Sequence, residues 1–263
     1  ATWRTVRWRP RVERVDAGIA CGLAGSVLLF FWPVLVTGAA SIPFDLQGWH
    51  YPQQAFAASA LRQGTWPLWN PYVYGGMPFH GNIQAALTYP FNLLALLVSN
   101  GFFEALPYRM LEAALALHFW WFGVGIFALA RHLGVGRAGA VGAAVAGMFG
   151  PCMASQTQHY NLVLGASWIP FAYLLAHRVC RAPNPSDATA LAVVLALQVL
   201  TGFAPGTLAF AVGLALFSGA QLCVRLRRGD ARAVGAMAGW LLWAAAAAVG
   251  LAAVQLVPFA EMA

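Results

Sequence analysis

One aspartate and three histidines are the side chains of this sequence best suited to acid–base or metal chemistry. Asp45 follows the apolar run Ile42-Pro43-Phe44, and His50, His80 and His159 lie in segments rich in amides and aromatic residues. A carboxylate beside apolar residues is costly to desolvate, so it usually has a partner, a metal ion or a catalytic role. Asp45 therefore suits a general base or a metal ligand. The structural alternative is that it caps the following helix or faces water.

The histidines leave two interpretations open. Two or three of them could hold a divalent metal ion together with Asp45, but neither His-x-x-x-His nor His-Glu-x-x-His occurs, so we assign no metal ligand. Hydrogen bonding in a polar pocket is the simpler role. Glu112 and His118 lie in a long apolar run; a carboxylate there is a functional candidate, whereas a histidine there is by default buried and hydrogen-bonded.

The elements that position these groups are predicted to be membrane helices. The chain has 263 residues, of which 60% are hydrophobic and 9% charged, whereas soluble domains carry about 25% charged residues. Its mean hydropathy is +0.67. This composition excludes a soluble enzyme, a disordered chain and a disulfide-stapled domain. Because the sequence has no lysine, Schiff-base and P-loop lysine mechanisms are also excluded.

We predict an all-α, polytopic membrane bundle that forms one transmembrane domain over residues 1–263, because apolar runs of about 20 residues recur along the chain. The predicted spans, about seven in number, are Ala17–Gly38, Pro107–Ala130, Ala138–Ala154, Leu162–His177, Ala188–Phe203, Gly206–Val224 and Val234–Val257.

The arginines predict the orientation of these spans. With seven crossings, 13 of the 15 arginines fall on the side of the N-terminal residues 1–16, and only Arg62 and Arg109 fall on the other. By the positive-inside rule, the N-terminus is then cytoplasmic. The net charge of +7 is therefore an orientation signal, and no nucleic-acid partner is expected.

Residues 39–106 then form a long extracytoplasmic loop in which, together with a short outer loop near Ser155–Asn161, polar residues other than arginine are concentrated. Pro52–Gln63 is predicted to be a helix lying on the surface, and the run Ala85–Ser99, which is too short to span, is predicted to be interfacial or re-entrant. The loop is rich in Trp and Tyr, which indicates either anchoring at the membrane interface or stacking against a sugar or lipid.

The loop resembles that of the YfhO-type bacterial membrane proteins. Its matching motifs are Asp45-x5-Tyr51-Pro52, Leu61-x2-Gly64, Pro67-Leu68-Trp69-Asn70-Pro71-Tyr72, Gly75-Gly76-Met77-Pro78-Phe79 and Asn82-x-Gln84-Ala85-Ala86-Leu87-x-Tyr89-Pro90-x-Asn92-Leu93. Further matches are Gln158-His159-x-Asn161, Ala166-x-Trp168-Ile169-Pro170 and Ala252-Ala253-Val254-Gln255-Leu256-Val257-Pro258. They follow the family's order over nearly the whole chain.

That family is placed with the GT-C superfamily of glycosyltransferases. The resemblance implies a multi-pass enzyme of the bacterial inner membrane that works among membrane lipids and uses a polyprenyl-phosphate-linked sugar at the extracytoplasmic face. Asp45 occupies the position of the acidic residue near the start of the first outer loop, so it would be the catalytic residue. The substrate-binding residues would be His50, Tyr51, Arg62, Asn70, His80, Asn82, Gln84, Arg109, His159 and Asn161, with the donor phosphate near Arg62 or Arg109.

A second expectation is a non-catalytic transmembrane subunit of a larger membrane complex. Asp45 stands alone in a loop where many GT-C enzymes have paired acids, and Gly202-Phe203-Ala204-Pro205 lacks the histidine of the family's Gly-His-Pro turn. Gly18-x3-Gly22 and Gly235-x3-Gly239 would let partner helices approach closely. A lipid-linked-sugar transporter is a third interpretation, although neither an inverted repeat nor paired charges within the predicted spans is visible.

Overall fold

The computed structural model describes residues 14–262. Residues 1–13, with four of the arginines that support the cytoplasmic N-terminus, lie outside the described residues, as does Ala263.

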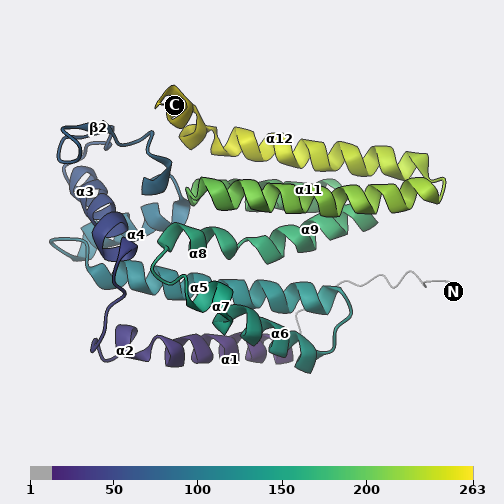
Figure 1. The fold of residues 1–263 in the computed structure, drawn as a ribbon, viewed down its shortest axis with the longest axis horizontal. Coiled ribbons are helices and arrows are strands. Elements are labelled where there is room, and N and C mark those ends of the chain that lie inside the picture. Colours follow the sequence, from purple (N-terminus) through teal and green to yellow (C-terminus); the bar gives the residue numbers. More distant parts are fainter. Residues whose placement is uncertain (1–13, 263) are drawn as a thin grey trace.

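The described chain is an all-α bundle with a smaller cap at one end, and the long helices run side by side in Figure 1. The helices of the bundle are α1 (Arg14–Phe30), α2 (Trp32–Leu35), α5 (Tyr108–His132), α6 (Arg137–Phe149), α7 (Pro151–Ala154), α8 (Tyr160–Ala166), α9 (Ile169–Arg181), α10 (Pro185–Leu200), α11 (Ala204–Arg227) and α12 (Ala231–Met262). The all-α part of the predicted fold class is thus confirmed for the described residues.

Four segments of the described chain are helical, long and apolar enough to cross a membrane. They are Tyr108–His132, the joined helices over Tyr160–Arg181, Ala204–Leu226 and Ala231–Met262. The other three predicted spans fall on α1 and α6, which are shorter than predicted, and on α10, which has 16 residues. Helix α1 stops shortly before Pro33, and helix α6 stops shortly before Pro151. Proline has no backbone N–H to donate to a carbonyl of the preceding turn, so it does not continue a helix.

The segment between α2 and α5, which we call the cap (residues 39–106), crosses one end of the bundle (Figure 1). Its elements are the π-helical turn η1 (Leu46–His50), α3 (Tyr51–Arg62), the short hairpin β1 (Trp69–Asn70) and β2 (Met77–Pro78), the 3-10 turn η2 (Ile83–Ala85) and α4 (Pro90–Phe102). The predicted surface helix Pro52–Gln63 corresponds to α3. Helix α4 occupies most of the predicted short run and starts on Pro90, a favoured first helical residue.

Cap and bundle share one hydrophobic core. Leu46, Phe79 and Leu87 of the cap are buried in the same cluster as Leu115 and Phe119 of α5. Burying each such large side chain contributes about 1.5–3 kcal/mol. The cap is therefore held firmly enough to position polar side chains.

A buried hydrogen-bonded chain also fastens the cap to two bundle helices. The indole N–H of Trp168 donates to the Tyr89 hydroxyl at 3.0 Å, and this hydroxyl lies 2.7 Å from Nε2 of His118. Nδ1 of His118 lies 2.6 Å from the Ala114 carbonyl, which can only accept, so Nδ1 carries the proton and Nε2 accepts from Tyr89. His118 is thus buried and fully hydrogen-bonded, as the sequence analysis expected.

Candidate functional site

The structure brings Asp45 and His159 together from positions 114 residues apart. Nδ1 of His159, just before α8, lies 2.9 Å from Oδ2 of Asp45, at the start of the cap. The Asp45 side chain is 55% exposed and the His159 side chain 39% exposed, so solvent or a substrate can reach the pair. Nε2 of His159 lies 3.3 Å from the amide nitrogen of Gln158, a donor, so the ring proton belongs on Nδ1 and points at Asp45.

The second oxygen of Asp45, Oδ1, receives no hydrogen bond from residues 14–262. Asp45 precedes η1, yet its side chain makes no capping hydrogen bond there. Helix capping, one half of the structural alternative for this residue, is therefore wrong, whereas the 55% exposure of the side chain agrees with its other half, a carboxylate that faces water. One carboxylate oxygen is oriented by a histidine and the other is free to accept a proton, which is the arrangement that a general base requires.

His50 lies behind this pair as a buried neutral group. It is 7% exposed, and its ring centroid is 5.6 Å from that of Tyr160. Burial lowers the pKa of His50 to about 4; the nearby Asp45 opposes this shift, and His159 adds to it. Near pH 7 the imidazole is therefore uncharged, and it can hydrogen-bond but cannot neutralise Asp45.

A layer of buried amides continues from His50 towards the η2 turn. The amide of Asn82 donates to Oε1 of Gln53 at 2.8 Å, and that of Gln54 donates to the Ala85 carbonyl at 2.6 Å. Asn161, next to Tyr160, donates to the Gln84 carbonyl at 2.8 Å. Nε2 of Gln53 and Oδ1 of Asn161 are buried without a partner in the described chain.

The backbone leading to Asp45 is held by two residues from the first two turns of α5. Oε1 of Glu112 accepts the N–H of Ile42 at 2.8 Å, and the Tyr108 hydroxyl donates to the Ile42 carbonyl. Phe44 then adopts a left-handed conformation with φ of +61°, which is costly for a side chain of this size. Such strain persists only where the surroundings enforce it, so Glu112 and Tyr108 help to direct Asp45.

The other predicted site residues lie in separate contacts. The Tyr51 hydroxyl donates to the Leu106 carbonyl at 2.9 Å, and Oδ1 of Asn70 accepts from its own turn. The guanidinium of Arg62 donates to the Glu104 and Phe103 carbonyls and to Asn100, and that of Arg109 packs against Gly38. His80 accepts from the Trp66 indole at 3.3 Å. These residues hold the cap together, whereas Asp45, His50 and His159 form the candidate site.

Gln53 and Gln54 of the amide layer, and Tyr160 beside His50, were not predicted to be site residues from the sequence. A signal existed for the first two, because they lie three and four residues after His50 and so share its helix face. Tyr160 gave no such signal, since its hydroxyl meets Asn92 from 68 residues away, at 2.8 Å.

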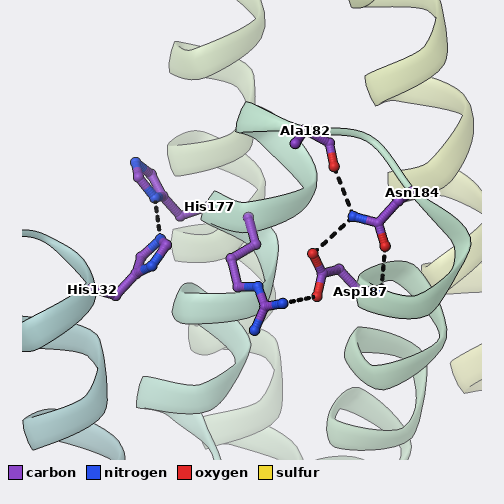
Figure 2. Close-up of polar contacts among 6 residues, drawn as sticks. His132, His177, Ala182, Asn184 and Asp187 are labelled. Carbon is purple, nitrogen blue, oxygen red and sulfur yellow. Dashed lines mark hydrogen bonds and ion pairs between the residues drawn. The ribbon is translucent and has the colours of Figure 1, made fainter. Parts of the chain in front are cut away.

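A second polar cluster, drawn in Figure 2, lies where α9 ends and α10 begins, at the end of the bundle opposite the cap (Figure 1). Arg178 donates to Oδ1 of Asp187 at 2.7 Å, and the Asn184 amide donates to Oδ2 at 2.8 Å. The Asn184 oxygen caps α10 by accepting the Asp187 N–H at 2.9 Å. Nearby, Nε2 of His132 and Nδ1 of His177 are 2.8 Å apart and join α5 to α9.

Within residues 14–262, no group of three or more His, Cys, Asp or Glu side chains is arranged to hold a metal ion. Comparison with protein-family models, with curated protein sequences and with solved structures finds no match for this chain.

Proposed function

We propose that this protein is a membrane glycosyltransferase that takes a sugar from a polyprenyl-phosphate donor at the extracytoplasmic face, with Asp45 as general base. The observation that carries the proposal is the state of the Asp45 carboxylate. His159 orients one oxygen, the other has no partner among residues 14–262, and the side chain is more than half exposed. The sequence resemblance supplies the substrate class.

In the proposed reaction, Oδ1 of Asp45 accepts the proton of an acceptor hydroxyl. The hydroxyl oxygen forms a bond to the anomeric carbon as the bond from that carbon to the phosphate oxygen breaks, and the electron pair leaves with polyprenyl phosphate. The N–H of His159 keeps Oδ2 occupied and so directs Oδ1 towards the hydroxyl. The amide atoms without a partner among residues 14–262, Nε2 of Gln53 and Oδ1 of Asn161, would hydrogen-bond the sugar hydroxyls.

Two arginines are available on this side of the molecule for the donor phosphate, and we favour Arg109. Arg62 is occupied by three oxygens of the cap. Arg109 lies in the first turn of α5, where free backbone N–H groups also attract anions. It is three residues from Glu112, which holds the segment leading to Asp45.

The proposed topology has seven crossings, with α1–α2, α6–α7 and α10 added to the four long apolar segments. Helix α1 has 17 residues, close to the minimum that spans the hydrocarbon core, and α2 prolongs it. This topology puts the Asp45 site outside and the Arg178–Asp187 cluster in the cytoplasm. It is consistent with the cap and the α5–α6, α9–α10 and α11–α12 turns lying at opposite ends (Figure 1).

The test is transfer of a radiolabelled sugar from polyprenyl-phosphate donors by purified Asp45→Asn protein. Asp230→Asn is the matched control, because Asp230 is a similarly exposed aspartate, 56% accessible, in the α11–α12 turn. We expect wild-type and Asp230→Asn protein to transfer sugar and Asp45→Asn protein to be inactive although folded. Full activity of Asp45→Asn protein would contradict the proposal.

A second candidate function, a structural subunit of a membrane complex, is favoured by one observation. Gly18, Gly22 and Gly25 of α1 and Gly235 and Gly239 of α12 have no non-neighbouring atom of the described chain near the position of a Cβ. Their small faces are therefore open to another helix. Stoichiometric copurification of a second membrane protein, without transferase activity, would favour this function.

A further inference from the structure

A pocket on the outer surface of the cap lies apart from the Asp45 site. It has a volume of about 270 Å³ and is formed by the second half of α3 and the turns on either side of β1. We call it the aromatic pocket; the lining residues that matter here are Ser59, Gln63, Thr65, Trp66, Trp69 and Tyr72. Ser59 is nine residues beyond His50, or about 13 Å along the helix.

Each ring of the aromatic pocket has one contact with the cap and is otherwise well exposed; Tyr72 is 84% exposed. The Trp66 indole N–H donates to His80 at 3.3 Å, so the polar edge of this ring is occupied. Trp69 packs on Gly76, where a Cβ would come within 2.6 Å of the ring. Gly76 also has φ of +114°, so this position requires glycine. Tyr72 is in edge-to-face contact with Phe56, with ring centroids 6.1 Å apart.

The polar groups between these rings have hydrogen-bonding capacity to spare. Ser59 Oγ accepts a long bond of 3.4 Å from the Gln63 amide, which leaves the serine O–H and the Gln63 oxygen available. The Thr65 hydroxyl donates to the Ala60 carbonyl and can still accept. None of the described residues that line the pocket is charged.

We propose that the aromatic pocket binds one pyranose ring of a neutral saccharide. A pyranose has an apolar face of C–H groups, which fits the electron-rich face of an indole, and a rim of hydroxyls, which needs alternating donors and acceptors. The volume lies just below the roughly 300–1,000 Å³ of sites for drug-sized ligands, so it suits a single ring. Charged ligands are disfavoured because no lining side chain would neutralise them.

This binding does not depend on the proposed catalysis. The pocket would hold a saccharide whether the protein transfers sugars or only recognises a glycan, and Asp45 takes no part in it. An Asp45→Asn protein should therefore bind saccharide as the wild type does, so a failure of the proposed function can be told from a failure of this one.

The experiment is saturation-transfer difference NMR on the protein in lipid nanodiscs prepared without glycoside detergents. The probes are the methyl glycosides of glucose, galactose, mannose and N-acetylglucosamine. We expect saturable transfer to the ring C–H protons of at least one probe, with a dissociation constant on the order of 1 mM. Absence of saturable transfer from all four would overturn the proposal.

Variants locate the signal and separate a sugar from a lipid. Trp69→Ala and Gln63→Ala should each weaken binding by on the order of tenfold, while Trp243→Ala, which removes an exposed tryptophan of α12, should leave it unchanged. An equal loss of saccharide binding in Trp243→Ala protein would contradict the assignment of binding to the aromatic pocket. Dodecyl maltoside should compete with the probe and dodecyl phosphocholine should not; competition by both would show an acyl-chain site and overturn the proposal.

Discussion

Two carboxylates at opposite ends of the bundle are used in opposite ways. Asp187 is mostly buried, and its two carboxylate oxygens accept from Arg178 and Asn184. Its backbone N–H donates to the side-chain oxygen of Asn184 (Figure 2). Asp45 is more than half exposed and contacts one histidine, and its other oxygen has no partner in the part of the chain that the structure describes. A saturated carboxylate has no capacity for a substrate, whereas an oriented and unsaturated one does. The comparison therefore indicates a structural role for Asp187 and supports the proposed chemical role of Asp45.

The largest difference between the two carboxylates should appear in activity. Asp45→Asn should lower the rate of sugar transfer by about 10²–10⁴-fold, the usual contribution of a general base. Asp187→Asn, which keeps an oxygen for Arg178, should leave the rate of transfer within about twofold of wild type. Initial rates with the same polyprenyl-phosphate donor measure both effects, and equal losses in the two variants would remove the distinction.

The order of the two carboxylates should reverse when stability is measured. Asp187→Ala leaves the buried side of Arg178 and the Asn184 amide without their partner, so it should lower the free energy of unfolding by about 2–4 kcal/mol. Asp45→Ala removes only an exposed contact and should cost less than about 1 kcal/mol. Thermal unfolding in one detergent compares them; a larger loss for Asp45→Ala would indicate that Asp45 is structural.

The stability of the folded protein should also depend on pH through His50 of the candidate site. Its pKa is lowered to about 4 in the folded protein against 6.5 as the ordinary value, so between these values the unfolded chain binds more protons. Stability should therefore fall as the pH drops from about 6.5 towards 4, by up to about 3 kcal/mol.

Thermal midpoints at pH 7 and pH 5 test this dependence. His50→Gln should make the loss of stability between pH 7 and pH 5 smaller, while His80→Gln, which changes a half-buried histidine of the cap, serves as the control. Equal pH dependence in wild-type and His50→Gln protein would show that another group is responsible.

The smallest expected effect is on the stability contributed by the Asp45–His159 contact itself. His159→Gln should change the free energy of unfolding by less than about 1 kcal/mol, since exposed ion pairs contribute little, while it impairs transfer because Oδ2 loses its orienting N–H. Chemical denaturation and rate measurements on the same preparation test this separation. A large loss of stability with intact transfer would reverse the roles assigned to the pair.

The sequence predicted the all-α class and the surface helix of the cap, because hydropathy and helical spacing are local properties. It also singled out Asp45 and His159, although their contact joins residues 114 positions apart and could not be predicted from local patterns. Two predicted spans are longer than the observed helices α1 and α6, because Pro33 and Pro151 lie inside the apolar runs and the helices stop just before them. The clamp of Glu112 and Tyr108 on Ile42 was also missed, since it depends on where α5 meets the cap.

The measurement that tests the central claim most directly is release of polyprenyl phosphate by the wild-type protein, purified in mild detergent, from polyprenyl-phosphate-linked hexoses. The account predicts release that grows with time and protein concentration, requires an acceptor with a free hydroxyl, and disappears in Asp45→Asn protein. Release that persists in Asp45→Asn protein, or none from any donor with folded wild-type protein, would contradict a catalytic role for Asp45.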